Sequence, residues 1–439
     1  MRLRGTKRER SGHFAGSPFT CSPVSQFCDF KSFLALFLIM DILEKLLCDE
    51  EWQSFLSYKK QKGHLSSSEE KALNEFINKK AYLTVANRLN CGGSFSVPEA
   101  VKINKSFSDK KRTVFVFPPE ENTVQKMLAY QLLGYDGVFC DNLFSFRREL
   151  GVKKALFSII GVPDIRLKYS YKLDISDYFN SVDAKLLLPQ LKAVLSDEPR
   201  LYSLIENMLL TPYALVDGKK QEIKKGILAG SPVSGFLANL FLTELDRHFY
   251  KLGVPYARYS DDIILFADTP EELTAHTDYI NQFLAEHSLS VNTEKVFTSA
   301  PCEKWTFLGF CYRDGIIDIS EASKNKLKKK MRRKANALVR WKRKKNAEPE
   351  RAVRAFIRHF NRKLFCNPIK NELTWARWYF PIINTDESLK ELDAYMQQCM
   401  RYIATEKRSK AQFNFKYEQM KSLGYTTLVN SFYKSKGKE

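Results

Sequence analysis

Two short runs rich in aromatic and β-branched residues meet at a pair of acids, Asp261 and Asp262. Residues 254–258 form the first run, Tyr259 and Ser260 follow it, and residues 263–267 form the second run. This pattern predicts a β-hairpin with the two acids at its turn. Carboxylates held side by side repel each other unless a cation lies between them, and such hard oxygen ligands suit Mg²⁺. An ordinary solvent-exposed aspartate turn is the alternative interpretation.

A third acid, Asp174, ends another strand-like run with apolar residues on both sides. A lone buried carboxylate is costly, so Asp174 needs a partner, and a metal ion shared with Asp261 would provide one. Asp183, a little further on, is a candidate N-cap for a helix over residues 184–195.

Charge and composition narrow the class of partner. The 439 residues carry a formal net charge of +20, which indicates a polyanion partner, most simply nucleic acid. No stretch approaches the roughly 18 apolar residues of a spanning helix, so we expect no membrane partner. The nine cysteines include no C-x-x-C pair and the six histidines are dispersed, which argues against zinc and disulfides and favours the cytoplasm.

Several elements can be predicted from local patterns. Serines and acids at residues 66–70 predict a helix that starts there and runs to about Leu89. Thr269 and Pro270 predict the start of a helix that ends near His287. Residues 289–297 and 305–312 are typical of strands.

Residues 324–345 are helical in pattern and unusually basic. They contain thirteen Lys and Arg residues and no acid. Because so many cations would repel one another, we expect a polyanion beside this helix rather than a merely solvated face.

The order of these motifs resembles the reverse transcriptases of bacterial retrons and group II introns. The resemblance covers roughly residues 100–345 and rests on seven segments in the expected order. These segments are residues 111–125, residues 145–147 with 155–156 downstream, residues 174–183, residues 226–234 with 238–240, residues 258–262, the set Leu289, Asn292 and Lys295, and residues 307–310.

The resemblance implies an α+β right-hand polymerase with fingers, a palm built on an antiparallel sheet, and a helical thumb. The expected parts are a disordered extension over 1–39, with Met40 as a possible natural start, a helical region over 40–99, fingers and palm over 100–319, a basic thumb over 320–370 and a helical region over 371–439.

It also implies roles for individual residues. Asp174, Asp261 and Asp262, with the backbone carbonyl of Ile175, would hold two Mg²⁺ ions for nucleotidyl transfer from dNTPs. The residues expected near the incoming nucleotide are Lys111, Arg112, Arg147, Phe179, Ala229, Gly230 and Lys295. Phe179 would lie under the sugar and exclude a 2′-hydroxyl, and Arg147 is the preferred phosphate ligand because a guanidinium binds phosphate bidentately. Phe307, Leu308 and Gly309 would form the primer grip, and Lys328, Lys329, Arg332 and Arg333 would track the template and primer.

One departure from the family pattern affects which kind of DNA synthesis and which biological role we expect. Leu228 and Ala229 stand where most members have Pro-Gln, and that glutamine normally lies by the incoming nucleotide. The loss resembles specialised bacterial reverse transcriptases linked to antiphage defence, some of which make untemplated DNA. We therefore expect cDNA synthesis on a dedicated non-coding RNA, with untemplated or protein-primed synthesis, an RNA-dependent RNA polymerase and a non-catalytic RNA-binding scaffold as alternatives. The oligomeric state is not indicated by the sequence.

Overall fold

The computed structural model describes residues 40–62, 65–104, 111–210, 213–223, 225–365, 374–407 and 409–437. The expected disordered extension over 1–39 therefore lies outside the described residues. By contacts between Cα atoms the chain divides into residues 1–41 and one compact unit, 42–439. Everything below concerns this second unit, and the finer domain boundaries remain predictions.

The unit begins with short helices that pack around Trp52 and Tyr82, both of which are fully buried. These helices are α2 (Ile42–Lys45), α3 (Asp49–Lys62), α4 (Ser67–Asn78) and α5 (Leu83–Asn90). Ser66 and Glu69 form the expected capping box at the start of α4. The single helix predicted to reach Leu89 is wrong, because Lys80 takes a left-handed conformation with φ of 50° and separates α4 from α5.

A four-stranded sheet follows, in the order β2-β1-β4-β5. It consists of β1 (Glu99–Asn104), β2 (Lys111–Val116), β4 (Tyr213–Val216) and β5 (Lys219–Glu222). The helical elements between β2 and β4 are α6 (Pro119–Gln131), the 3-10 helix η1 (Leu132–Val138), α7 (Val152–Ile160), η2 (Ile165–Leu167), α8 (Tyr178–Ser181), α9 (Ala184–Val194) and α10 (Pro199–Leu210). Asp183 caps α9 as expected, since its side chain accepts a hydrogen bond from the Lys185 backbone N–H.

The central sheet is antiparallel throughout, with the order β6-β7-β3-β8. Its strands are β3 (Tyr169–Asp174), β6 (Tyr256–Tyr259), β7 (Asp262–Ala267) and β8 (Phe297–Ser299). The helices α11 (Ser234–Phe241), α12 (Thr243–Leu252) and α13 (Pro270–Glu286) and the 3-10 turn η3 (Thr293–Lys295) accompany it. The strand predicted over residues 289–297 is wrong, because Thr293–Lys295 forms η3, Val291 makes only an isolated bridge to Ile175, and only Phe297 enters β8.

Both faces of the central sheet are buried, and β7 shows why. Ile263 and Leu265 belong to the core that includes α13, whereas Ile264 and Phe266 belong to the core that includes α7. Successive strand residues point to opposite faces, so a continuous apolar run fills two cores at once. The acids at the start of β7 are thereby set at the edge of a rigid platform.

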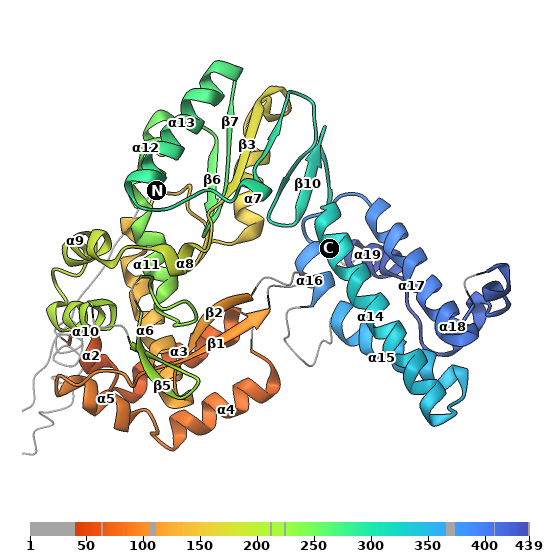
Figure 1. Cartoon of the computed structure of the whole chain (residues 1–439), viewed down its shortest axis with the longest axis horizontal. Helices are drawn as coiled ribbons and strands as arrows, with labels where there is room; N and C mark the ends of the chain where they lie inside the picture. The colour runs from red at the N-terminus through yellow and green to blue at the C-terminus, as the bar shows by residue number, and fades with distance from the viewer. Residues whose placement is uncertain are drawn as a thin grey trace, which may run out of the picture. The chain divides into compact units, whose positions relative to one another are not determined.

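A small sheet and a helical region complete the unit (Figure 1). The sheet has the order β11-β10-β9 and consists of β9 (Trp305–Phe307), β10 (Phe310–Arg313) and β11 (Ile316–Ile319). The predicted strand over 305–312 is thus two strands joined by a turn at Leu308 and Gly309. The remaining elements are α14 (Glu321–Lys345), α15 (Pro349–Leu364), α16 (Trp375–Tyr379), α17 (Glu387–Thr405), η4 (Lys410–Asn414), α18 (Tyr417–Ser422) and α19 (Leu428–Lys436). The expected α+β fold class with antiparallel sheets is confirmed.

Candidate active site

The structure brings the three predicted acids to one end of the central sheet. Asp174 ends β3 and pairs in register with Asp262 at the start of β7. Asp261 lies in the two-residue turn between β6 and β7, since Tyr259 pairs with Asp262. The Ile175 N–H donates a hydrogen bond of 3.1 Å to the Asp261 carbonyl, which ties the turn to the end of β3. The hairpin prediction is therefore confirmed, with Asp261 in the turn and Asp262 on the strand.

The three carboxylates interact electrostatically. Burial, together with the neighbouring charges of Asp174 and Asp262, raises the pKa of Asp261 to about 6. Two lysines offset the negative charge: the Lys295 ammonium is 2.7 Å from Asp174 Oδ2, and the Lys172 ammonium is 3.3 Å from Asp262 Oδ1. Lys172 was not among the predicted site residues. Its position on β3 does not by itself predict that its ammonium group contacts Asp262.

Within the described residues, no three His, Cys, Asp or Glu side chains are gathered into a ready-made metal site. Asp174 and Asp262 each have a carboxylate oxygen beside an ammonium group. Asn292 also donates its side-chain N–H to Asp174 Oδ1 at 3.3 Å. A divalent cation would have to take the place of these ammonium groups, and the three carboxylates supply the oxygen ligands that such an ion prefers.

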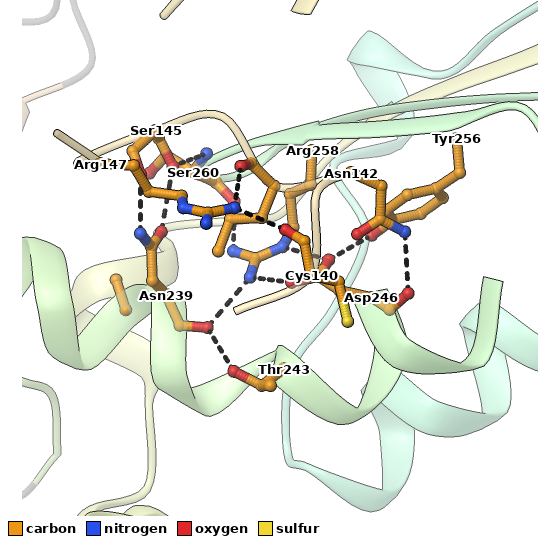
Figure 2. Close-up of polar contacts among 12 residues, drawn as sticks. Cys140, Asn142, Ser145, Arg147, Asn239, Thr243, Asp246, Tyr256, Arg258 and Ser260 are labelled. Carbon is orange, nitrogen blue, oxygen red and sulfur yellow. Dashed lines mark hydrogen bonds and ion pairs between the residues drawn. The ribbon is translucent and has the colours of Figure 1, made fainter. Parts of the chain in front are cut away.

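A buried ion pair fixes the turn that carries Asp261 (Figure 2). Arg258 is fully buried and binds the Asp246 carboxylate of α12 through both Nε and Nη2. Arg258 also donates to the Ser260 carbonyl at 3.2 Å, and the Ser145 hydroxyl accepts a hydrogen bond of 2.8 Å from the Ser260 N–H. Ser260 has φ of 62°, so these contacts hold a left-handed residue beside the acids. Arg258 belongs to one of the predicted motifs, whereas no local sequence pattern marks Asp246 as its partner.

Arg147 is held by hydrogen bonds within the same region (Figure 2). Its side chain donates to the Asp136 carboxylate at 2.9 Å and to the Cys140 and Leu143 carbonyls at 2.6 and 3.2 Å. Only 7% of the side chain is exposed. Its predicted contact with a triphosphate stays a prediction, but the structure shows the guanidinium bracing the loop that carries Ser145.

The glycine-containing loop over residues 226–234 lies against β2 and α8. The Phe115 N–H donates to the Ala229 carbonyl at 2.7 Å, and the Ile227 N–H donates to the Phe179 carbonyl at 2.8 Å. Gly230 has φ of 107°, and an added Cβ would lie 2.9 Å from the Phe115 carbonyl oxygen. Glycine is therefore required there by both conformation and space. The loop thus links Phe179 to the strand that begins with Lys111 and Arg112, which are exposed.

Phe179 is partly buried beside a second aromatic ring. Its ring packs edge-on against that of Phe146, with 6.4 Å between centroids. Phe146 is 51% exposed, has φ of 53° and lies over Gly235, where a Cβ would approach its ring to 2.8 Å. The two rings therefore form one aromatic surface.

A cavity of about 960 Å³ extends from the acids to the small sheet and the start of α14. Asp174, Asp261 and Asp262 line it together with the turn residues Leu308 and Gly309. Leu308 and Gly309 both have positive φ, and the Gly309 carbonyl accepts a hydrogen bond from Ser320, the N-cap of α14. Residues 307–309 thus link the acids to the basic helix.

Residues 103–312 match the protein family described as Reverse transcriptase (RNA-dependent DNA polymerase). The chain contains a reverse transcriptase domain. The matched segment includes all three acids and the residues 307–309.

Among solved structures, similar folds occur in telomerases. Apo telomerase from Candida tropicalis truncated at its C-terminal domain is 13% identical, with 52% of this chain and 55% of that chain aligned and a TM-score of 0.43. Apo telomerase from the same organism is 12% identical over 75% of this chain and 68% of that chain, with a TM-score of 0.42. Telomerase from Candida albicans with a fragment of telomeric RNA is 10% identical over 81% and 71%, with a TM-score of 0.42. The chain thus spans about half the length of the truncated telomerase.

A comparison with curated proteins gave no match. No helix among the described residues of the reverse transcriptase domain or its flanking regions is long and apolar enough to cross a bilayer.

The basic helix α14 differs from the sequence expectation in one respect. Acids from α17 and its C-terminal end neutralise part of it: Glu391 pairs with Lys324 and Lys328, and Glu406 pairs with Lys342 and Arg343. Four of the thirteen cations of residues 324–345 are therefore paired within the chain, and a polyanion beside this helix stays a prediction. Lys329, Arg332 and Arg333 are exposed.

Proposed function

We propose that this reverse transcriptase domain synthesises cDNA from an RNA template by two-metal nucleotidyl transfer at Asp174, Asp261 and Asp262. The observation that carries the proposal is the register of the central sheet, which sets Asp174 opposite Asp262 with Asp261 in the adjoining turn. All three line the same cavity as the turn at Leu308 and Gly309.

The metal site would use the three carboxylates and the Ile175 carbonyl. When bound, two Mg²⁺ ions there would activate the primer 3′-hydroxyl and stabilise the departing pyrophosphate. In the present structure Lys295 pairs with Asp174 and Lys172 pairs with Asp262.

The other residues position the substrates. Lys111, Arg112 and Lys295 would meet the triphosphate, and Arg147 would brace the loop beside it. Ala229 and Gly230 would border the incoming nucleotide, and Phe179 would exclude the 2′-hydroxyl of a ribonucleotide. Residues 307–309 would hold the primer end, and Lys329, Arg332 and Arg333 would meet phosphates of the template and primer, with Lys328 contributing less because it is paired with Glu391.

A primer-extension assay tests this proposal. We expect the full chain to extend a DNA primer on an RNA template with dNTPs and Mg²⁺. Replacing Asp261 and Asp262 with Ala should lower the rate by at least about 1,000-fold, since the lost metal stabilisation is worth several kcal/mol. RNA affinity and folding should stay near wild type, and full activity of the variant would contradict the assignment.

We further propose that the chain belongs to the bacterial retron-related lineage and acts in the cytoplasm in antiphage defence, with a dedicated non-coding RNA as template. The support is the departure at Leu228 and Ala229. The same departure favours a second candidate function, untemplated or protein-primed DNA synthesis. Omitting the RNA template from the assay separates the two, because only the second yields product without it.

A further inference from the structure

A second cavity adjoins the catalytic one, between α14, α15 and α16. Its volume is about 590 Å³, and its walls include Trp375, Trp378, Lys330, Arg362 and Lys363. We call it the tryptophan pocket. It is continuous with the catalytic cavity, since Leu327, Lys330, Trp375, Trp378 and Tyr379 line both.

The two tryptophan side chains of the pocket keep part of their surface exposed. Trp375 and Trp378 are only partly buried, although they flank the well-buried Tyr379. The Trp375 ring packs on the Tyr379 ring with 4.6 Å between centroids, which fixes one of its edges and leaves part of its surface toward the cavity. A partly open indole surface offers a stacking platform for a planar, apolar-faced ligand such as a nucleobase.

The charge around the tryptophan pocket is of one sign. Among the described residues, no Asp or Glu lines it. A third cavity of about 510 Å³ continues from it along α14 and α15, shares Lys330 and Lys363, and adds Arg333, Lys334 and Arg340. His359 also lines this cavity, and burial together with the charges of Lys363, Lys334 and Arg362 lowers its pKa, which reflects the positive potential there. Phosphates are the natural counterpart of such a row of cations.

We propose that the tryptophan pocket binds unpaired nucleotides of single-stranded nucleic acid, whose bases stack on Trp375 and Trp378 while the phosphates follow the cations of α14 and α15. Stacking on side chains requires bases that are not paired in a duplex, so the site selects single strands over duplexes. The inference rests on the proposed function in that the strand is the template or product of the same active site.

Oligonucleotide binding to the full chain tests the proposal without any synthesis. Labelled single-stranded DNA, single-stranded RNA and an RNA–DNA duplex are titrated separately by fluorescence anisotropy, with dNTPs omitted. Replacing Trp375 and Trp378 with Ala should weaken single-strand binding by about tenfold or more and duplex binding by less than about twofold. Tighter binding of single-stranded DNA would identify the bound strand as the product, and tighter binding of single-stranded RNA would identify it as the template.

Matched variants separate stacking from packing. Trp375→Phe with Trp378→Phe retains aromatic faces and should restore most of the single-strand affinity. Arg362→Ala with Lys363→Ala changes two exposed side chains and should flatten the slope of log affinity against log salt by about 1.4, at 0.7 per phosphate contact on single strands. The Arg362→Ala, Lys363→Ala variant still tests the proposal if the Trp→Ala variant is poorly folded.

Two results would overturn the inference. One is wild-type single-strand affinity in a folded Trp→Ala variant together with an unchanged salt slope in the Arg362→Ala, Lys363→Ala variant. The other is an equal loss of single-strand and duplex binding. Because binding is measured without dNTPs, either result leaves the primer-extension test of the proposed function intact.

Discussion

At the residue scale, Asp261 combines burial with two acidic neighbours. Its folded-state pKa of about 6 lies above the ordinary value of 3.8. The deprotonated form is thus disfavoured in the folded chain without a cation, and stability is lost as the pH rises from about 4 through 6. A cation that binds the carboxylates would reverse this cost.

Asp261→Asn should therefore stabilise the metal-free protein in a pH-dependent manner. We expect almost no gain near pH 4, and a gain of about 1–3 kcal/mol in the free energy of unfolding above pH 6, since each pKa unit corresponds to about 1.4 kcal/mol. Chemical denaturation with a chelator present measures this difference. Adding Mg²⁺ should stabilise the wild type more than the variant, and a gain that is equal at pH 4 and pH 8 would show that Asp261 does not titrate as described.

Phe179 provides the second prediction at this scale. Replacing it with Val opens space where a ribonucleotide 2′-hydroxyl would project, so we expect higher rNTP incorporation with a modest loss on dNTPs. Single-nucleotide extension with matched dNTP and rNTP gives the ratio. Phe146→Leu serves as a control for disturbance of the neighbouring ring. A loss on both substrates with an unchanged ratio would make Phe179 a packing residue.

At the scale of the element, α14 has one side that is neutralised by the chain itself and another that is not. Lys324 and Lys328 meet Glu391, whereas Arg333 and Lys334 line the basic cavity with α15. A helix can present these two environments because residues three and four apart share a side. Sequence position alone does not distinguish the two sets of cations.

Neutralising Arg333 and Lys334 should flatten the slope of log affinity against log salt for single-stranded nucleic acid by up to about 1.4, at roughly 0.7 per phosphate contact. Neutralising Lys324 and Lys328 should leave that slope nearly unchanged and instead release Glu391. Filter binding across a salt series compares the two pairs of variants. Equal effects from both pairs would mean that the ion pairs with Glu391 do not persist in solution.

At the scale of the whole molecule, the central sheet joins two hydrophobic cores. Leu265 and Phe266 are neighbours on β7, yet they contribute to different cores. A substitution on either face of β7 should therefore destabilise the whole central sheet that carries the acids, because both cores share this strand.

Leu265→Ala and Phe266→Ala test this sharing. Each should lower the free energy of unfolding by about 2–5 kcal/mol, as is usual for large-to-small changes in a core. Differential scanning calorimetry should show both variants shifting the same transition. Two separate transitions, each sensitive to one substitution, would indicate that the cores unfold independently.

The α+β class, several helix starts and the three candidate acids could be predicted from the sequence alone. These features are local: a cap needs one side chain and the next few backbone N–H groups, as at Ser66, Asp183 and Thr269. The acids stood out because charged residues interrupt or end runs that otherwise read as buried strands.

The pairing of the charged side chains, in contrast, is known only from the folded chain. The partners of Arg258, Asp262 and Lys328 lie far away in the sequence or on another element, and Arg147 is occupied by carbonyl groups that no side-chain pattern reveals. The break at Lys80 and the turn at Leu308 depend on residues in left-handed conformations that are not glycine. Such conformations are disfavoured locally, so they form only where long-range packing and hydrogen bonds offset their cost.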